Sequence, residues 1–403
     1  MQLIGRRRDG VAPLLVATLS WYTNPDKGST MTTVTLNQPT TAPVRPMSAA
    51  PAIVLADGCL ATLEGKVAHG LLRGTDRFAV RAVVDRLLAG LDAGQVVDRA
   101  TTGIPVVATV ADALRHAPDA TVAVIGHAPH GGRVTPELRA LLMECAAAGL
   151  DLVSGLHDHL CDDTDLAQLV AANGATITDV RRTRPARELR FWDGSVHSVR
   201  ASRIAVLGTD CAIGKRTTAR MLTHELNARA VRTEMIYTGQ TGWLQGGRYG
   251  IIFDSLISDF VAGELEGAIV SCAEDLDPDV MIIEGQGALR HPAGPCGATL
   301  MLSGAVAGVV LQHAPRRTHY DGLDGLDAAR IASLASEIEL IRHYGVPVLA
   351  VVLNLTGVAP HDIDRVVDEC RTHSGDIPVI DVLGGGIAVL ANTVMESVVR
   401  QAH

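Results

Sequence analysis

Short apolar runs alternate with longer stretches of helical periodicity from about residue 51 onward. In the first half, the helical stretches include Pro136–Ala148. The apolar runs are Ile53–Ala56, Ala79–Val84, Val106–Val107, Thr121–Ile125, LDLVSG at 150–155 and ATITDV at 175–180. Short, mainly apolar runs between helical segments are typical of strands in an open α/β sheet.

A second alternation begins at Arg203, after a charged stretch that contains an FWDGS turn. Its strand candidates are Ile204–Leu207, Glu234–Tyr237, Val280–Ile283, Gly308–Gln312, Pro347–Leu353 and Pro378–Val382. Its helix candidates are Lys215–Ala228, Ser255–Cys272, Ala328–Tyr344, His361–Arg371 and Ile387–Arg400. We predict two doubly wound α/β domains, a Rossmann-like sheet over 51–180 and a second parallel sheet over 203–403, joined by a linker over 181–202.

Composition supports this class and excludes others. Hydrophobic residues make up 47% of the chain but aromatics only 3%, so the apolar mass is aliphatic, as in parallel strands covered by helices. The net charge of −9 argues against a nucleic-acid partner, and no apolar run is long enough to predict a membrane span. Seven scattered cysteines without a C-x-x-C pair indicate a reducing compartment, so we expect a cytoplasmic protein. Residues 1–50 are rich in Thr and Pro and predict a disordered extension, within which Met31 is a plausible true start.

The stretch RIAVLGTDCAIGKRTTARML, residues 203–222, predicts a phosphate-binding loop between a strand and a helix. Gly208 and Gly214 would let backbone N–H groups converge on phosphate, and Lys215 would supply a cation. The loop is one residue longer than usual, and Arg216 stands where Ser or Thr normally ligates Mg²⁺. Downstream, DPDVMIIEGQG predicts an adjacent strand that ends in Glu284, a carboxylate that could hold metal or act as a base.

At these residues the chain resembles the dethiobiotin synthetase type of P-loop protein, which implies a P-loop NTPase-like second domain. The shared elements are the loop from Gly208-Thr209-Asp210 to Gly214-Lys215, the Glu284-Gly285-Gln286-Gly287 turn and VVLNLTG, whose Asn354 could read a base edge. The lysine that this family carries after its second strand is absent from IYTGQTGWLQGG. This resemblance implies an alternative function, an ATP- and Mg²⁺-dependent ligase or kinase that activates a carboxylate. Its metal ligands would be Thr217, Asp254 and Glu284.

Longer blocks resemble the two-domain D-glutamate N-acetyltransferase-like family. They are GTDCAIGKRTTA, TGQTG, DSLISDFVAGELE and EGQGALRHPA, with KVAHGLLR, GHAPHGGRV and SGLHDHLCDD in the first domain. The resemblance implies acetyl transfer from acetyl-CoA to the amino group of an acidic amino acid such as D-glutamate, in a homo-oligomer of two or more subunits. The P-loop would then bind the CoA diphosphate, through Gly208, Thr209, Cys211, Gly214, Lys215, Arg216, Thr217, Thr218 and Asn354.

Amide formation from a thioester needs a base for the amine and N–H donors for the oxyanion. We expect Glu284 or Asp210 as the base with His69 as second choice, and the amides of 285–287 as the donors. The candidates for substrate binding are Lys66, Arg73, Gly131, Gly132, Gln240, Asp254, Gln286, Arg290 and His291, with Arg316, Arg317 and His319 as further carboxylate ligands. A metal site at His127, His130, His157 and His159 is a weaker alternative, and so is a CoA- or nucleotide-sensing regulator without turnover.

Overall fold

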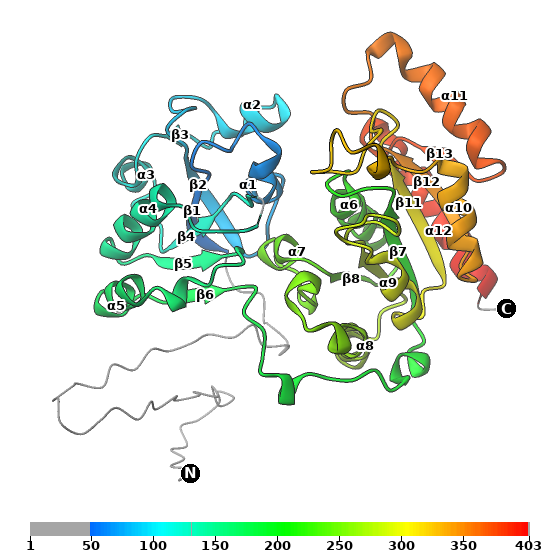
Figure 1. The fold of residues 1–403 in the computed structure, drawn as a ribbon, viewed down its shortest axis with the longest axis horizontal. Coiled ribbons are helices and arrows are strands. Elements are labelled where there is room, and N and C mark those ends of the chain that lie inside the picture. Colours follow the sequence, from blue (N-terminus) through cyan, green and yellow to red (C-terminus); the bar gives the residue numbers. More distant parts are fainter. Residues whose placement is uncertain (1–48, 130, 402–403) are drawn as a thin grey trace.

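The computed structural model describes residues 49–129 and 131–401 (Figure 1). Of the extension predicted over residues 1–50, residues 1–48 with the possible start at Met31 lie outside the described residues, and Ala50 already belongs to the first strand. Two parallel sheets form two α/β domains, which confirms the predicted fold class.

The first sheet has the strand order β3-β2-β1-β4-β5-β6, with every neighbouring pair parallel. Its strands are β1 Ala50–Leu55, β2 Phe78–Val84, β3 Val106–Val107, β4 Val122–Ile125, β5 Asp151–Ser154 and β6 Ile177–Asp179. Its helices are α1 Lys66–Leu72, α2 Ala93–Asp98, α3 Val110–His116, α4 Pro136–Ala147 and α5 Thr164–Ala172. This order is that of a Rossmann-type sheet, in which ligands bind at the carboxyl ends of the strands.

The second sheet has the order β13-β12-β11-β7-β10-β8-β9 and is also parallel throughout. Its strands are β7 Ser202–Gly208, β8 Thr233–Tyr237, β9 Tyr249–Gly250, β10 Val280–Glu284, β11 Gly308–His313, β12 Val348–Leu353 and β13 Val379–Ile380. Its helices are α6 Lys215–Ala228, α7 Gln240–Leu244, α8 Ser258–Leu276, α9 Gly297–Ser303, α10 Leu334–His343, α11 Ile363–Ser374 and α12 Ile387–Gln401. The strand that carries the phosphate loop, β7, is central and lies next to β10, as the sequence predicted.

Both sheets bury both faces under helices, which explains why their strands are nearly continuous apolar runs. In the second domain, α8, α9 and α10 cover one face, and α6 and α12 cover the other. In the first domain, α3, α4 and α5 cover one face, and α1 and α2 cover the other. That last core also contains the fully buried Leu244 of α7, so the second domain contributes to the first domain's core.

Hydrogen bonds join the two domains. They connect α1 and the loop after it to the end of α7. Gln245 donates through Nε2 to the carbonyl of Gly70 over 2.6 Å, and Thr75 donates to the carbonyl of Leu244 over 2.8 Å. The Arg77 guanidinium lies 3.9 Å from the centre of the Trp243 ring. Because α1 and α7 each follow the carboxyl end of a strand, the loops at the two carboxyl edges are brought near each other (Figure 1).

Within the described residues, one helical stretch, Val382–Arg400, is long and apolar enough to cross a membrane. Its residues Leu390, Ala391 and Val394 are fully buried in the core of the second domain. This packing is the kind expected of a core helix in an α/β domain, and by itself the stretch is weak evidence for a span.

Candidate active site

The phosphate loop runs from the end of β7 at Gly208 to the start of α6 at Lys215. Ala212 and Gly214 have left-handed backbone conformations, with φ values of 50° and 106°. Alternation of such residues turns successive N–H groups toward one point, which forms an anion-binding nest. Within the part of the chain that the structure describes, the N-cap residue of α6, Gly214, makes no side-chain capping bond. The first turn of α6 therefore has N–H donors free for an anion, as a phosphate site requires.

Lys215 lies folded within this loop. It is buried, and its Nζ donates to the carbonyl of Asp210 over 2.5 Å. Two glycines make room for its stem, because a Cβ atom at Gly208 would lie 2.8 Å from its Cδ and one at Gly285 would lie 3.0 Å from it. Burial lowers the pKa of Lys215, and the charges of Asp210 and Glu284 oppose this effect. An incoming anion could draw Nζ away from the carbonyl.

Side chains from β11 and from the residue after β12 hold the loop in shape. Thr218 donates to Gln312 Oε1 over 2.7 Å, and Asn354 donates through Nδ2 to the carbonyl of Ile213 over 2.9 Å. Thr209 lies 3.0 Å from Nδ1 of His313, and burial lowers the pKa of His313 to about 4, so this ring is neutral. Three of the predicted cofactor residues, Thr209, Thr218 and Asn354, thus support the loop through their side chains.

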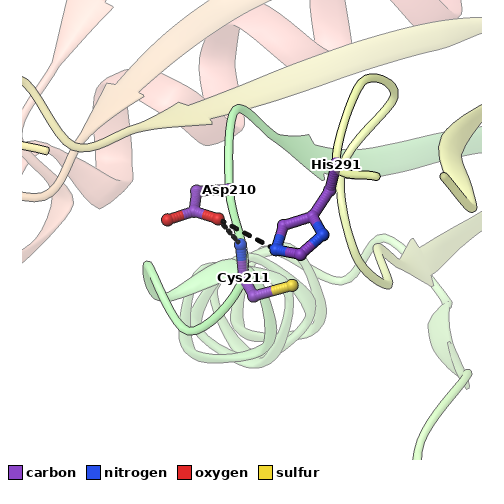
Figure 2. Close-up of side chains that lie close together, drawn as sticks. All are labelled: Asp210, Cys211 and His291. Carbon is purple, nitrogen blue, oxygen red and sulfur yellow. Dashed lines mark hydrogen bonds and ion pairs between the residues drawn. The ribbon is translucent and has the colours of Figure 1, made fainter. Parts of the chain in front are cut away.

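Asp210 is itself fully buried and lies at the centre of a polar cluster that includes Cys211 and His291 (Figure 2). It accepts hydrogen bonds from Arg317 over 2.6 Å, from the Cys211 amide over 2.7 Å and from the Asp321 amide over 3.1 Å. His291 Nε2 lies 3.8 Å from the same carboxylate. Because a cation and two amides already take its oxygens, Asp210 organises three loops and has little capacity left to act as a base.

The same cluster brings Asp210, Cys211 and His291 close enough for one metal ion, with ligand atoms within 4.8 Å of one another. The donor chemistry does not fit a metal. The Asp210 oxygens are hydrogen-bonded as above, and His291 Nδ1 accepts from the Ala293 amide over 3.2 Å. Burial also raises the pKa of the Cys211 thiol, which keeps it protonated and neither a metal ligand nor a nucleophile.

Glu284 ends β10 beside the phosphate loop, opposite Val206 of β7. It is almost fully buried, and its Oε2 accepts from the amide of Thr238 over 3.1 Å. Its Oε1 lies 3.9 Å from Arg216 Nη1. Burial raises the pKa of Glu284, and Arg216 is the largest opposing influence. A buried carboxylate with a raised pKa and a lightly bonded oxygen has the properties of a general base.

Lys66 and His69 lie in α1 and Arg73 ends it, and His69 and Arg73 are bonded to groups of their own domain. Lys66 is exposed at the start of α1 and close enough to lower the pKa of the Cys211 thiol in the phosphate loop, while His69 and Arg73 are close enough to interact electrostatically with Arg216. His69 Nε2 is bonded to the carbonyl of Leu60 over 2.7 Å. Arg73 forms a two-pronged ion pair with Asp98, with distances of 2.9 and 2.7 Å.

Two other predicted substrate residues lie in the contact between the domains. Arg181, which is almost fully buried, donates to Gln240 Oε1 over 2.9 Å and to both Asp254 oxygens over 2.7 and 3.2 Å. The helix expected from Ser255 begins instead at Ser258, after a short 3₁₀ turn that contains Asp254, so Asp254 does not cap it.

The remaining predicted residues divide between the site and its surroundings. Gln286 lies in the turn after Glu284, where its Oε1 would be 3.5 Å from a Cβ atom at Gly239. Arg290 points instead to α10, where it bonds Ser336 Oγ over 2.9 Å. Gly132 packs against His157, where a Cβ atom would lie 2.6 Å from that ring, and Gly131 has open space around it.

Of the four histidines of the alternative metal site, the three that the structure describes do not come together as metal ligands. His157 lies 3.9 Å from Asp254, His159 lies 3.7 Å from Asp162, and His127 is buried. His130 lies outside the described residues.

Sequence reasoning overlooked Arg181, Thr238 and Gln312. Gln312 had a readable signal, because it is a polar residue inside the otherwise apolar run GVVLQ. No sequence signal marked Arg181, because it is one of several arginines in a charged stretch and no pattern distinguishes it from the others.

Comparisons with known proteins agree with this architecture. A family model described as "Domain of unknown function (DUF1611_C) P-loop domain" matches residues 190–391, and a second, described as "Domain of unknown function (DUF1611_N) Rossmann-like domain", matches residues 86–183. A crystal structure of a DUF1611 family protein from Anabaena variabilis superposes with a TM-score of 0.78 at 29% identity. That likeness covers 86% of this chain and 99% of the other.

Two curated relatives are named D-glutamate N-acetyltransferase. The protein from Tritonibacter scottomollicae is 38% identical over 214 residues, which are 52% of this chain and 61% of that protein. The protein from a Pseudoalteromonas species is 29% identical over 282 residues, which are 67% of this chain and 80% of that protein. The chain therefore belongs to the DUF1611 family, with an N-terminal Rossmann-like domain and a C-terminal P-loop domain, and its relatives include proteins named D-glutamate N-acetyltransferase.

Proposed function

We propose that this protein is an N-acetyltransferase that moves an acetyl group from acetyl-CoA to the amino group of an acidic amino acid such as D-glutamate. The names of two relatives support the reaction class. The observation that carries the proposal is the position of Glu284, a buried carboxylate with a raised pKa, at the end of the strand beside the phosphate loop. An anion anchor and a base thus lie side by side.

In this proposal the P-loop holds the CoA diphosphate. The amides of the Ala212–Gly214 nest and of the first turn of α6 donate to the phosphate oxygens, and Lys215 leaves the Asp210 carbonyl to contact them. Arg216, in the same turn, adds a guanidinium. No nucleotide hydrolysis is needed for this use of the loop.

Glu284 takes a proton from the substrate ammonium, and the free amine attacks the thioester carbon. The new C–N bond forms a tetrahedral intermediate, whose oxyanion the amides of 285–287 stabilise. The C–S bond then breaks, and the thiolate of CoA leaves with the remaining excess proton of the nitrogen. The products are the N-acetylamino acid, CoA and the proton held by Glu284.

Lys66 is the cation of the first domain best placed to bind a substrate carboxylate, because it is exposed at the start of α1 and close to the phosphate loop. His69 and Arg73 already have partners and are not assigned to the substrate. The enzyme would act on a small acidic substrate in the cytoplasm, as a homo-oligomer.

The test is an acetylation assay that follows release of the CoA thiol and detects the N-acetyl product, with the D and L forms of glutamate and aspartate. Glu284→Gln keeps the shape of the side chain, and we expect it to lower kcat by about 10²- to 10⁴-fold. The wild-type rate should rise with pH through the raised pKa of Glu284, and the variant should lose that rise.

Glu234→Gln is the matched control, because Glu234 is a partly buried carboxylate of β8 paired at 3.7 Å with Arg248. It should leave the rate unchanged. Full activity of Glu284→Gln would contradict the assigned base. Formation of ADP from ATP with a carboxylate substrate, without thiol release from acetyl-CoA, would replace the proposal by the ligase or kinase.

A further inference from the structure

The first helical residue after the P-loop lysine is an arginine, at the position where a hydroxyl normally ligates Mg²⁺. We propose that the Arg216 guanidinium takes the place of Mg²⁺ in this site, so that the loop binds a diphosphate without a divalent cation. This inference rests on the proposed function only for the identity of the ligand, the diphosphate of CoA.

The residues that would hold Mg²⁺ do not form a metal site. In P-loop proteins the ion is held by a Ser or Thr hydroxyl after the lysine and by a carboxylate at the end of a nearby strand. Thr218, one of two candidate hydroxyls, is buried and donates to Gln312. Thr217, the other, follows Arg216 on the helix and projects about 100° around the axis from it. Asp254 is bound on both oxygens by Arg181.

Arg216 instead faces the strand carboxylate itself. Its Nη1 lies 3.9 Å from Glu284 Oε1, and the side chains are 25% and 5% exposed. The other acid of the loop, Asp210, is neutralised by Arg317. Lys215, Arg216 and Arg220 therefore all act on the Glu284 carboxylate, so positive charge is in excess beside the free amides. A diphosphate supplies the missing negative charge, and the planar guanidinium can bind two phosphate oxygens at once.

The first domain holds the guanidinium in place. A Cβ atom at Gly70 of α1 would lie 3.2 Å from Arg216 Nη2 and 2.8 Å from Thr241 Cγ2, so glycine lets α1 approach both. The bond from Gln245 to the Gly70 carbonyl fixes this approach. Arg216 thus lies between Glu284 and α1, preorganised for a ligand.

The experiment measures binding of ADP, and separately of CoA, by calorimetry in EDTA and in excess MgCl₂. For the wild type we expect affinities that agree within about 2-fold in the two buffers. Arg216→Thr restores the usual hydroxyl. This substitution should weaken binding about 10- to 100-fold in EDTA, as expected for loss of a hydrogen-bonded charge. The variant should recover part of the lost affinity when Mg²⁺ is added. Arg216→Lys keeps the charge but not the planar group that can bind two oxygens at once. Its affinity in EDTA should therefore lie between those of the wild type and Arg216→Thr.

Arg229→Thr is the control substitution, because Arg229 ends the same helix far from the loop and pairs with Glu225. It should bind like the wild type, and circular dichroism should show that each variant keeps its helix content. Loss of wild-type affinity by 10-fold or more in EDTA, unchanged binding by Arg216→Thr in EDTA, or no binding of either diphosphate would overturn the inference.

The two ligands separate this inference from the proposed function. Metal-independent binding of ADP without CoA binding or acetyl transfer would refute the acetyltransferase and leave the role of Arg216 intact. CoA binding that requires Mg²⁺, together with acetyl transfer, would support the acetyltransferase and refute the role of Arg216.

Discussion

The ion pair between Arg181 and Asp254 should contribute more to stability than a chemically matched pair on the surface. Arg181 is 8% exposed and Asp254 32%, and they form a two-pronged contact at 2.7 and 3.2 Å. Arg73 and Asp98 form the same contact at 2.7 and 2.9 Å, but both are more than 40% exposed. Water access is thus the main difference between the pairs.

We expect a coupling energy of about 2–3 kcal/mol for the buried pair. Removing one partner of a fully buried pair costs about 3–5 kcal/mol, and the partial exposure of Asp254 lets water recover some of this. The surface pair should give about 0.2–1 kcal/mol and should weaken with salt.

Two double-mutant cycles measure these energies, one with Arg181→Met and Asp254→Asn and the other with Arg73→Met and Asp98→Asn. Trp243 is a suitable reporter of domain separation in urea, because it lies in the interface under Arg77. Trp21 and Trp192 should be replaced by phenylalanine so that Trp243 alone emits. Equal coupling energies in the two cycles, or less than about 1 kcal/mol for the Arg181 pair, would refute the reasoning.

Three further predictions address the second domain. Lys215→Ala should weaken CoA binding at least about 100-fold in calorimetry, because it removes the cation of the loop; unchanged affinity would mean that CoA binds elsewhere. His313 has a pKa of about 4 when folded, below its ordinary 6.5. The unfolded chain therefore binds the extra proton first, and stability should fall by up to about 3 kcal/mol as pH drops from 6.5 toward 4. In urea titrations at pH 7 and 4.5, the free energy of unfolding should fall less for His313→Asn than for the wild type. An equal fall in both proteins would contradict the lowered pKa of His313 as the cause. Gly285→Ala should cost about 1–3 kcal/mol, since its Cβ atom would lie 2.2 Å from the backbone oxygen of Val206. Gly294→Ala, whose nearest neighbour would be 3.8 Å away, should cost far less in the same urea titration.

Local patterns predicted most of the fold. The helix after the phosphate loop has the predicted bounds, Lys215–Ala228, because Gly214 sets its start and the apolar periodicity ends at its last turn. Central strands such as β10 were found within one residue, since strands buried on both faces are unbroken apolar runs. The sequence did not reveal β9, which is only two residues long, or the five-residue α7. Such short elements contain too few positions to show a period.

The candidate site was predicted in part. The phosphate loop and the acidic strand lie side by side because their motifs end parallel strands, whose carboxyl ends meet at one edge of the sheet. The sequence did not reveal the partners of His69 and Arg73, because the Leu60 carbonyl and Asp98 are brought to them by the fold of their own domain.

What the sequence determined by itself is which segments are buried and where the phosphate loop begins, because burial periodicity and glycine conformation are local properties of the chain. It left Asp210 and Glu284 as equal candidates for the base. The tertiary structure gives them different surroundings, by bringing Arg317, 107 residues away, onto Asp210 and leaving Glu284 with one amide and a more distant arginine. The charge and the free lone pairs of an acid depend on which groups the fold brings within about 4 Å, and no local pattern records a contact made across a hundred residues.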